Sequence, residues 1–268
     1  MVQSGSNPVR PLALLPGVVL TLLGIGAMMS LASRPVALAI VGTLGFRGFL
    51  AVSEALLPLP SLLFFAFSGA SLRQALALVP LRRGGVVLCV GLGVALWLAS
   101  LGLLELQYTV WPPGPEYIEG FRRVHELLRP SGPLDAVVSL FAIAVLPAVC
   151  EETAIRGVLL PALRTKLVFP LALVLSAAVF ALMHDSYRMP FTFAVGLVLG
   201  ALRLHKGSLL PSMLAHASLN ALTFAAAPFL DDPTQPLPDP RPLLGLALLV
   251  AGSWGTYLLW RRLPESRS

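Results

Sequence analysis

Long, uninterrupted apolar stretches recur along most of the chain and determine its organisation. A helix of about 20 apolar residues is long enough to cross the hydrocarbon core of a bilayer, which is about 30 Å thick. Segments that alternate apolar and polar residues, as membrane barrel strands do, are absent from the sequence, so helices are the expected spanning elements. We therefore predict eight spans, at residues 11–32, 35–57, 84–106, 134–160, 167–184, 190–204, 208–229 and 243–260.

The connection between the second and third spans is interrupted by prolines. Pro58 and Pro60 break the chain before a short apolar stretch at residues 61–67. Residues 71–83 then mix apolar side chains with arginines and end shortly after Pro80. We predict that this second segment is a helix lying at the membrane surface.

A polar insert at residues 107–133 separates the third span from the fourth. Within it, Tyr117, Phe121 and Val124 recur at helical spacing, and charged residues occupy the opposite face. A helix with one apolar and one charged face is typical of an element that lies on the membrane surface or covers a cavity. We expect this insert to contain such a helix.

The composition excludes an ordinary soluble domain. Hydrophobic residues make up 56% of the 268 residues and charged residues only 12%, whereas soluble domains carry about 25% charged residues. A soluble fold of this length could not bury so much apolar surface. The sequence therefore predicts an all-α, polytopic membrane protein in which residues 1–268 form a single integral membrane domain.

Positive charge, +6 overall, lies mainly in the short loops between the apolar stretches. Basic residues in this position fix the topology of a membrane protein, so nucleic acid is not an expected partner. With eight spans, most of these basic residues lie on the same side of the membrane as both termini. Basic loops face the cytoplasm, so both termini are predicted to be cytoplasmic. The richness in Ala, Leu, Gly and Pro favours a bacterial inner (plasma) membrane. A cleavable signal peptide is the alternative for the first stretch, but its apolar length is unusually long for one.

Ionisable residues inside apolar helices are costly and mark functional sites. The fourth span carries Glu151, Glu152 and Arg156, the fifth ends at His184, and the seventh carries His216 and Asn220. Residues four apart share a helix face, so an ion pair between Glu152 and Arg156 is expected. Glu151 is turned about 100° away from Glu152 and can face a different environment.

The depth of these groups is consistent with one shared site. At about 1.5 Å per residue, Glu151 and His216 lie roughly 14 Å from the cytoplasmic helix ends, and His184 and Asn220 roughly 20 Å. Phe180 lies one turn before His184 and can pack against it. With ordinary helix tilt, the four polar groups can therefore meet in one layer.

The residue types suit the hydrolysis of a peptide bond, which needs a base for water and donors for the oxyanion. Glu151 is the candidate base, and His184 can orient the water and move the proton. His216 and Asn220 lie four residues apart and can donate hydrogen bonds together to the oxyanion. No serine has the context of an activated nucleophile.

Arg47 and Glu54 are two further charges, seven residues apart on one face of the second span. We predict that they form a structural charge couple. A role for both in lining the cavity is the alternative.

Three motifs occur in order on successive apolar helices: EExxxR at 151–156, FxxxH at 180–184 and HxxxN at 216–220. With them, the chain resembles the CPBP family of CAAX proteases and bacteriocin-processing enzymes, also called Abi, which includes the type II CAAX prenyl endopeptidases. The motif-bearing core covers about residues 134–229. Ile155 departs from the family pattern, which often has an aromatic residue before the arginine, and this affects packing more than chemistry.

The resemblance implies an eight-helix intramembrane endopeptidase with a conical active-site cavity. It implies that Glu151 and His184 activate water and that His216 and Asn220 form the oxyanion hole. Glu152 and Arg156, and with them Phe180, are then supporting residues. The expected substrate is a membrane-associated protein or peptide, cleaved in its C-terminal tail or leader.

Two questions stay open on the sequence. Glu151, His184 and His216 are also a feasible ligand set for Zn²⁺, although the HExxH motif is absent and the residues favour a metal-free mechanism. A buried Glu/His cluster can also relay protons in a transporter or channel, or persist in a non-catalytic scaffold. A transporter needs polar groups that reach both sides of the membrane, and the outer halves of these helices carry few.

Overall fold

The structure is a computed structural model and describes residues 12–31, 34–230 and 239–264. Within these residues it consists of helices and contains no strand, so the predicted all-α class is confirmed. The helices are α1 (Leu14–Leu31), α2 (Arg34–Leu56), α3 (Leu59–Phe67), α4 (Leu72–Ala75), α5 (Gly85–Val110), α6 (Pro115–Leu128), α7 (Pro133–Leu140), η1 (Phe141–Val145), α8 (Leu146–Glu152), η2 (Thr153–Leu159), α9 (Leu160–Arg164), α10 (Phe169–Leu182), α11 (Met189–Lys206), α12 (Leu210–Leu230) and α13 (Pro242–Arg262).

Large apolar side chains are exposed along many of these helices, as expected where lipid is the solvent. Within the described residues, five helices are long and apolar enough to cross a membrane: Leu14–Leu31, Pro35–Leu56, Gly85–Val110, Pro133–Arg164 and Pro242–Arg262. Helix α10 is apolar but shorter. The chain is therefore an integral membrane protein with several spans. The count of eight stays a prediction.

The span Pro133–Arg164 is continuous but changes its helical winding twice. The π-helical segments η1 and η2 each end shortly before a proline, Pro147 and Pro161. Proline has no amide hydrogen and its ring clashes with the carbonyl four residues earlier, so the hydrogen-bond ladder widens before it. Glu151 and Glu152 lie on the short α8 segment between these two distortions.

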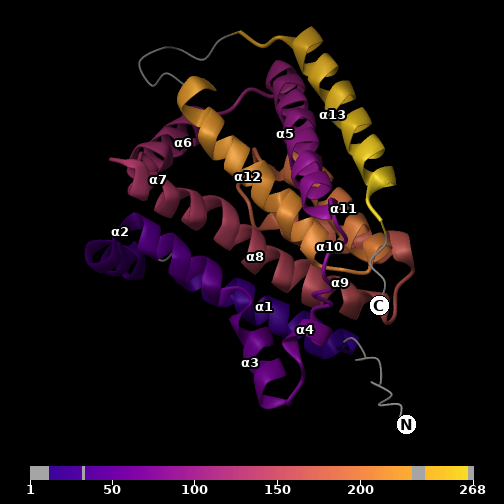
Figure 1. The fold of residues 1–268 in the computed structure, drawn as a ribbon. Coiled ribbons are helices and arrows are strands. Elements are labelled where there is room, and N and C mark those ends of the chain that lie inside the picture. Colours follow the sequence, from indigo (N-terminus) through magenta and orange to yellow (C-terminus); the bar gives the residue numbers. More distant parts are fainter. Residues whose placement is uncertain (1–11, 32–33, 231–238, 265–268) are drawn as a thin grey trace.

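This broken span is the centre of the molecule (Figure 1). Helices α1 and α2 pack on one side of it, and α12 packs on the other. Helix α5 lies between α12 and α13, and α10 packs along α11. The three motif-bearing elements are thus brought together by contacts of the central span with α10, α11 and α12.

Helices α5 and α13 approach closely because glycines face backbone at their contact. A Cβ on Gly102 would collide with the backbone nitrogen of Leu249, and one on Gly252 with that of Ala99. Small residues at helix contacts are how membrane helices gain packing without a hydrophobic driving force. Helix α5 also continues to Val110, four residues beyond the predicted end of the third span.

The predicted surface helix at 71–83 is wrong in extent, because only Leu72–Ala75 is helical. The chain turns at Ala77, which adopts a positive φ of 50°. The carbonyl of Ala77 accepts a hydrogen bond from the Leu209 amide at 3.1 Å, and that of Val79 accepts one from the Ser208 hydroxyl at 2.8 Å. These backbone groups therefore bond to the start of α12 instead of extending a helix.

The amphipathic helix predicted in the polar insert is present as α6. Tyr117 on α6 packs against Tyr187, with ring centroids 4.7 Å apart, and Tyr187 also contacts Trp111. Burial raises the pKa of Tyr117 to about 12. Helix α6 thus covers the turn that leads from α10 to α11.

The predicted charge couple between Arg47 and Glu54 is wrong. Arg47 instead forms an ion pair with Asp135 at 2.8 Å and donates to the Ser139 hydroxyl at 2.7 Å. Gly45, with φ 71°, kinks α2 just before Arg47, and this kink redirects the face that carries the arginine. Glu54 has no such partner, and its carboxyl oxygen Oε2 is buried without a hydrogen bond.

Candidate active site

The candidate site is built around an ion pair with no exposed surface. Arg156 Nη1 lies 2.7 Å from Glu152 Oε1, and both side chains are fully buried, so the predicted pair is present. Arg156 Nη2 also donates to the carbonyl of Gly196 at 3.2 Å. The guanidinium lies 4.2 Å from the centre of the Phe180 ring. A buried charge pair is tolerated when such additional partners satisfy its polar groups.

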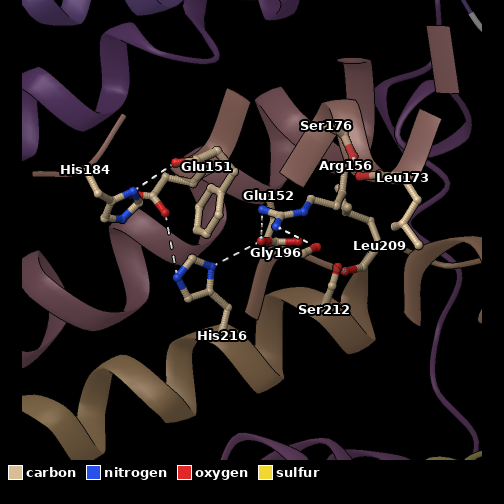
Figure 2. Close-up of polar contacts among 11 residues, drawn as sticks. Glu151, Glu152, Arg156, Leu173, Ser176, His184, Gly196, Leu209, Ser212 and His216 are labelled. Atoms are coloured by element: carbon tan, nitrogen blue, oxygen red, sulfur yellow. Dashed lines mark hydrogen bonds and ion pairs between the residues drawn. The ribbon is translucent and has the colours of Figure 1, made fainter. Parts of the chain in front are cut away.

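His216 connects this ion pair to the second glutamate (Figure 2). Its Nδ1 lies 3.1 Å from Glu152 Oε1, and its Nε2 lies 3.6 Å from Glu151 Oε2. The imidazole is therefore held between two neighbouring carboxyl groups that point in different directions. A ring fixed through one nitrogen presents the other nitrogen in a defined direction.

Glu151 differs from Glu152 in its surroundings, as the helical turn between them predicts. Its carboxyl is buried, and the oxygen Oε2 has no hydrogen-bond partner. Glu152 accepts hydrogen bonds at Oε1 from Arg156 and His216, which Glu151 does not, although the Oε2 atom of Glu152 also has no partner. One carboxylate is thus neutralised by a cation while the adjacent one stays available for a reactant.

His184 lies two residues beyond the end of α10, in the turn that follows it, and not within the helix as predicted. Its Nδ1 is 2.9 Å from the carbonyl of Phe180, which fixes the ring orientation. The Phe180 ring meets His184 edge-on with centroids 4.9 Å apart and His216 with centroids 5.7 Å apart. Both imidazoles therefore lie around one buried phenyl ring.

Asn220 follows His216 by one turn of α12 and is half-buried. Within the part of the chain that the structure describes, no hydrogen bond or ion pair joins it to the cluster. The structure therefore brings together the glutamates, Arg156 and His216, and links His184 to them through Phe180. It leaves Asn220 on the neighbouring turn.

Comparison with known proteins bears directly on this cluster. Residues 133–222 match the model of the family described as type II CAAX prenyl endopeptidase Rce1-like. The matched segment contains all three motifs and every residue of the cluster. Residues 133–222 are therefore similar to this family.

This match confirms the resemblance to CAAX proteases and implies an intramembrane endopeptidase activity. Comparisons with curated proteins and with solved structures each found no match. Helices α1 to α6 and helix α13 lie outside the matched segment. What these elements add to the site must therefore come from the chain's own geometry.

The described residues do not present a ready metal site. No three His, Cys, Asp or Glu side chains among them converge as metal ligands. His216 directs Nδ1 to Glu152, and His184 directs Nδ1 to a backbone carbonyl. The proposed Zn²⁺ ligand set of Glu151, His184 and His216 is not assembled in this arrangement, so we derive no step through a metal.

One contributor to the site was missed in the sequence. Gly196 on α11 supplies a carbonyl to Arg156, and a Cβ there would lie 3.2 Å from Ala177 and Phe180. A glycine inside an apolar helix is a signal for such a close approach.

Proposed function

We propose that this chain is an integral membrane endopeptidase that hydrolyses a peptide bond in a membrane-associated protein or peptide. One observation carries the proposal. A buried glutamate with a free carboxyl oxygen, Glu151, lies beside a histidine that the neighbouring ion-paired glutamate holds in place. This arrangement suits a base that must accept a proton from water next to a second group that can donate one.

The mechanism follows from these contacts. Glu151 accepts a proton from a water molecule while the water oxygen attacks the peptide carbonyl carbon. Nε2 of His216, protonated, and the Asn220 amide donate hydrogen bonds to the oxyanion, a contribution of roughly 3 kcal/mol per donor. As the carbon–nitrogen bond breaks, the proton held by Glu151 passes to the leaving amine. His184 orients the water through its Nε2.

Glu152 and Arg156 act on this chemistry through His216. The hydrogen bond from Nδ1 to Glu152 keeps the ring from rotating, so Nε2 stays directed at the reacting centre. Arg156 prevents Glu152 from acting as a second base, since it neutralises that carboxylate.

The proposed reaction needs no metal, and this makes a prediction. Cleavage should continue at the native rate after prolonged treatment with EDTA, because the activating groups are carboxyl and imidazole side chains. The measurement is the rate of peptide cleavage in detergent micelles before and after the treatment. Loss of activity that returns on addition of Zn²⁺ would instead support the metal-assisted alternative.

The substrate and location are part of the proposal. Members of the family act, by its description, on prenylated CAAX proteins. For this chain we propose a lipidated, transmembrane or leader-bearing peptide, cleaved in its C-terminal tail or leader. The basic loops support a bacterial inner membrane with both termini in the cytoplasm.

The proposal is tested by comparing the peptide termini of membrane proteins in two strains. One strain carries the native chain and the other carries Glu151→Gln at the same expression level. We expect at least one membrane protein to lose a processed terminus in the variant strain. Identical sets of termini would count against proteolysis and favour a transporter or a scaffold.

A further inference from the structure

Helix α2 delivers a third carboxyl group to the candidate site. Glu54 lies in the last turns of α2, which packs directly against α8, the segment that carries Glu151. Helix α2 therefore runs beside the central span, of which α8 is a part (Figure 1). Glu54 lies outside the matched family segment at 133–222 and has no part in the three motifs.

Contacts of α1 place Glu54 and Glu151 at the same depth. Gly17 packs on Ala162 of the central span, and Gly24 packs on the carbonyl of Leu57. From Gly17, Gly24 lies seven residues further along α1. Glu54 lies three residues before Leu57, which contacts Gly24, and so it is deeper in the same direction along the span. Together these steps place Glu54 about 15 Å from the level of Gly17 and Ala162 at the helical rise.

Glu151 is eleven residues from Ala162 along the central span, or about 16 Å by the same rise. Both carboxyl groups therefore lie in one layer, deep between the ends of the spans.

The charges around Glu151 support this placement. Of the charged groups that act on Glu151, Glu54 acts most strongly, followed by Glu152, Arg156 and Arg188. The described elements packed on this end of α2, α1 and α3, carry no charged residue.

Each of the two carboxyl groups has one buried oxygen, Oε2, without a hydrogen-bond partner. A buried acceptor without a donor is costly, and native proteins fill such places with ordered water or a ligand. A water molecule has two O–H donors, which matches two free acceptors at one depth. Among the described residues no hydrogen bond reaches either oxygen, and the His216 Nε2 nitrogen lies 3.6 Å from Glu151 Oε2.

We propose that Glu54 is a further residue of the active site, which holds the attacking water together with Glu151 from the α2 side. This inference rests on the proposed endopeptidase function. The Glu54 carboxyl accepts a hydrogen bond from one O–H group of the water, and this O–H bond stays intact. Glu151 takes the proton from the second O–H group. The oxygen lone pair is thereby turned toward the peptide carbonyl. Glu54 itself gains and loses no proton during the reaction.

The test uses the full-length protein in detergent micelles and a fluorogenic peptide that copies the junction found in the membrane proteome comparison. Glu54→Leu removes the acceptor and should lower kcat about 10- to 100-fold with KM changed less than about threefold. Glu54→Gln keeps one carbonyl acceptor and should retain most of the activity. Glu105→Gln on α5, whose carboxylate pairs with Arg241 outside the site, is the matched control and should leave kcat unchanged.

An unchanged kcat in Glu54→Leu would overturn the inference, and so would equal losses in the Leu and Gln variants. If Glu54→Leu does not fold, a high-resolution experimental structure of the native protein decides. It should show a water within hydrogen-bond distance of both Glu54 and Glu151, and carboxyl groups without a shared water would overturn the inference. Activity that survives Glu151→Gln would instead overturn the proposed function itself.

Discussion

Glu151→Gln is expected to lower kcat for peptide cleavage by about 10³-fold, because general-base catalysis is typically worth 10²- to 10⁴-fold. An amide has nearly the same shape as a carboxyl group but cannot accept the proton from water. The Oε2 atom of Glu151 makes no hydrogen bond in the native protein, so the substitution breaks none there. The measurement is single-turnover cleavage of the junction peptide in detergent micelles.

Thermal unfolding separates loss of chemistry from loss of fold. The melting temperature of Glu151→Gln should stay within a few degrees of the native value. Glu105→Gln serves as the control, since it also removes one carboxylate from a spanning helix but leaves the cluster intact. Near-native kcat in Glu151→Gln would contradict the proposed mechanism.

Arg156→Met should cause the largest loss of stability, about 3–5 kcal/mol in the free energy of unfolding. The arginine has no exposed surface, and its removal leaves the Glu152 carboxylate buried without its cation. The Gly196 carbonyl loses its donor, and the Phe180 ring loses its cation contact. The measurement is denaturant or thermal unfolding in one fixed detergent.

The double variant Glu152→Gln/Arg156→Met tests the cause of that loss. It removes both charges together, so no unpaired charge remains buried and part of the lost stability should return. Equal losses in the single and the double variant would show that packing around Arg156, and not its charge, is responsible. His216 keeps an acceptor at position 152 in the double variant but loses the negative charge, so activity should stay low.

The central span Pro133–Arg164 shows a structural feature that the sequence pattern does not specify. Pro147 and Pro161 are visible in the sequence, and a proline inside a span signals a distorted helix. The sequence does not say whether the distortion is a kink or a π-helical segment. Here two π-helical segments surround α8, and the direction in which Glu151 and Glu152 point depends on that choice.

The sequence by itself determined the features that depend on composition and on neighbouring residues. The apolar stretches established an all-α membrane protein, because hydropathy and length alone decide whether a helix can span. The pair of Glu152 with Arg156 followed from a spacing of four residues on one helix. The three motifs identified the cluster and the family.

Only the tertiary structure decided which distant groups meet. His216 bonds to Glu152 across 64 positions, and Arg47 pairs with Asp135 across 88 positions and not with Glu54 on its own helix. Helix α2, which carries Glu54, packs on α8, which carries Glu151. Such contacts are fixed by how helices pack against one another, and the periodicity of a single helix carries no record of that packing.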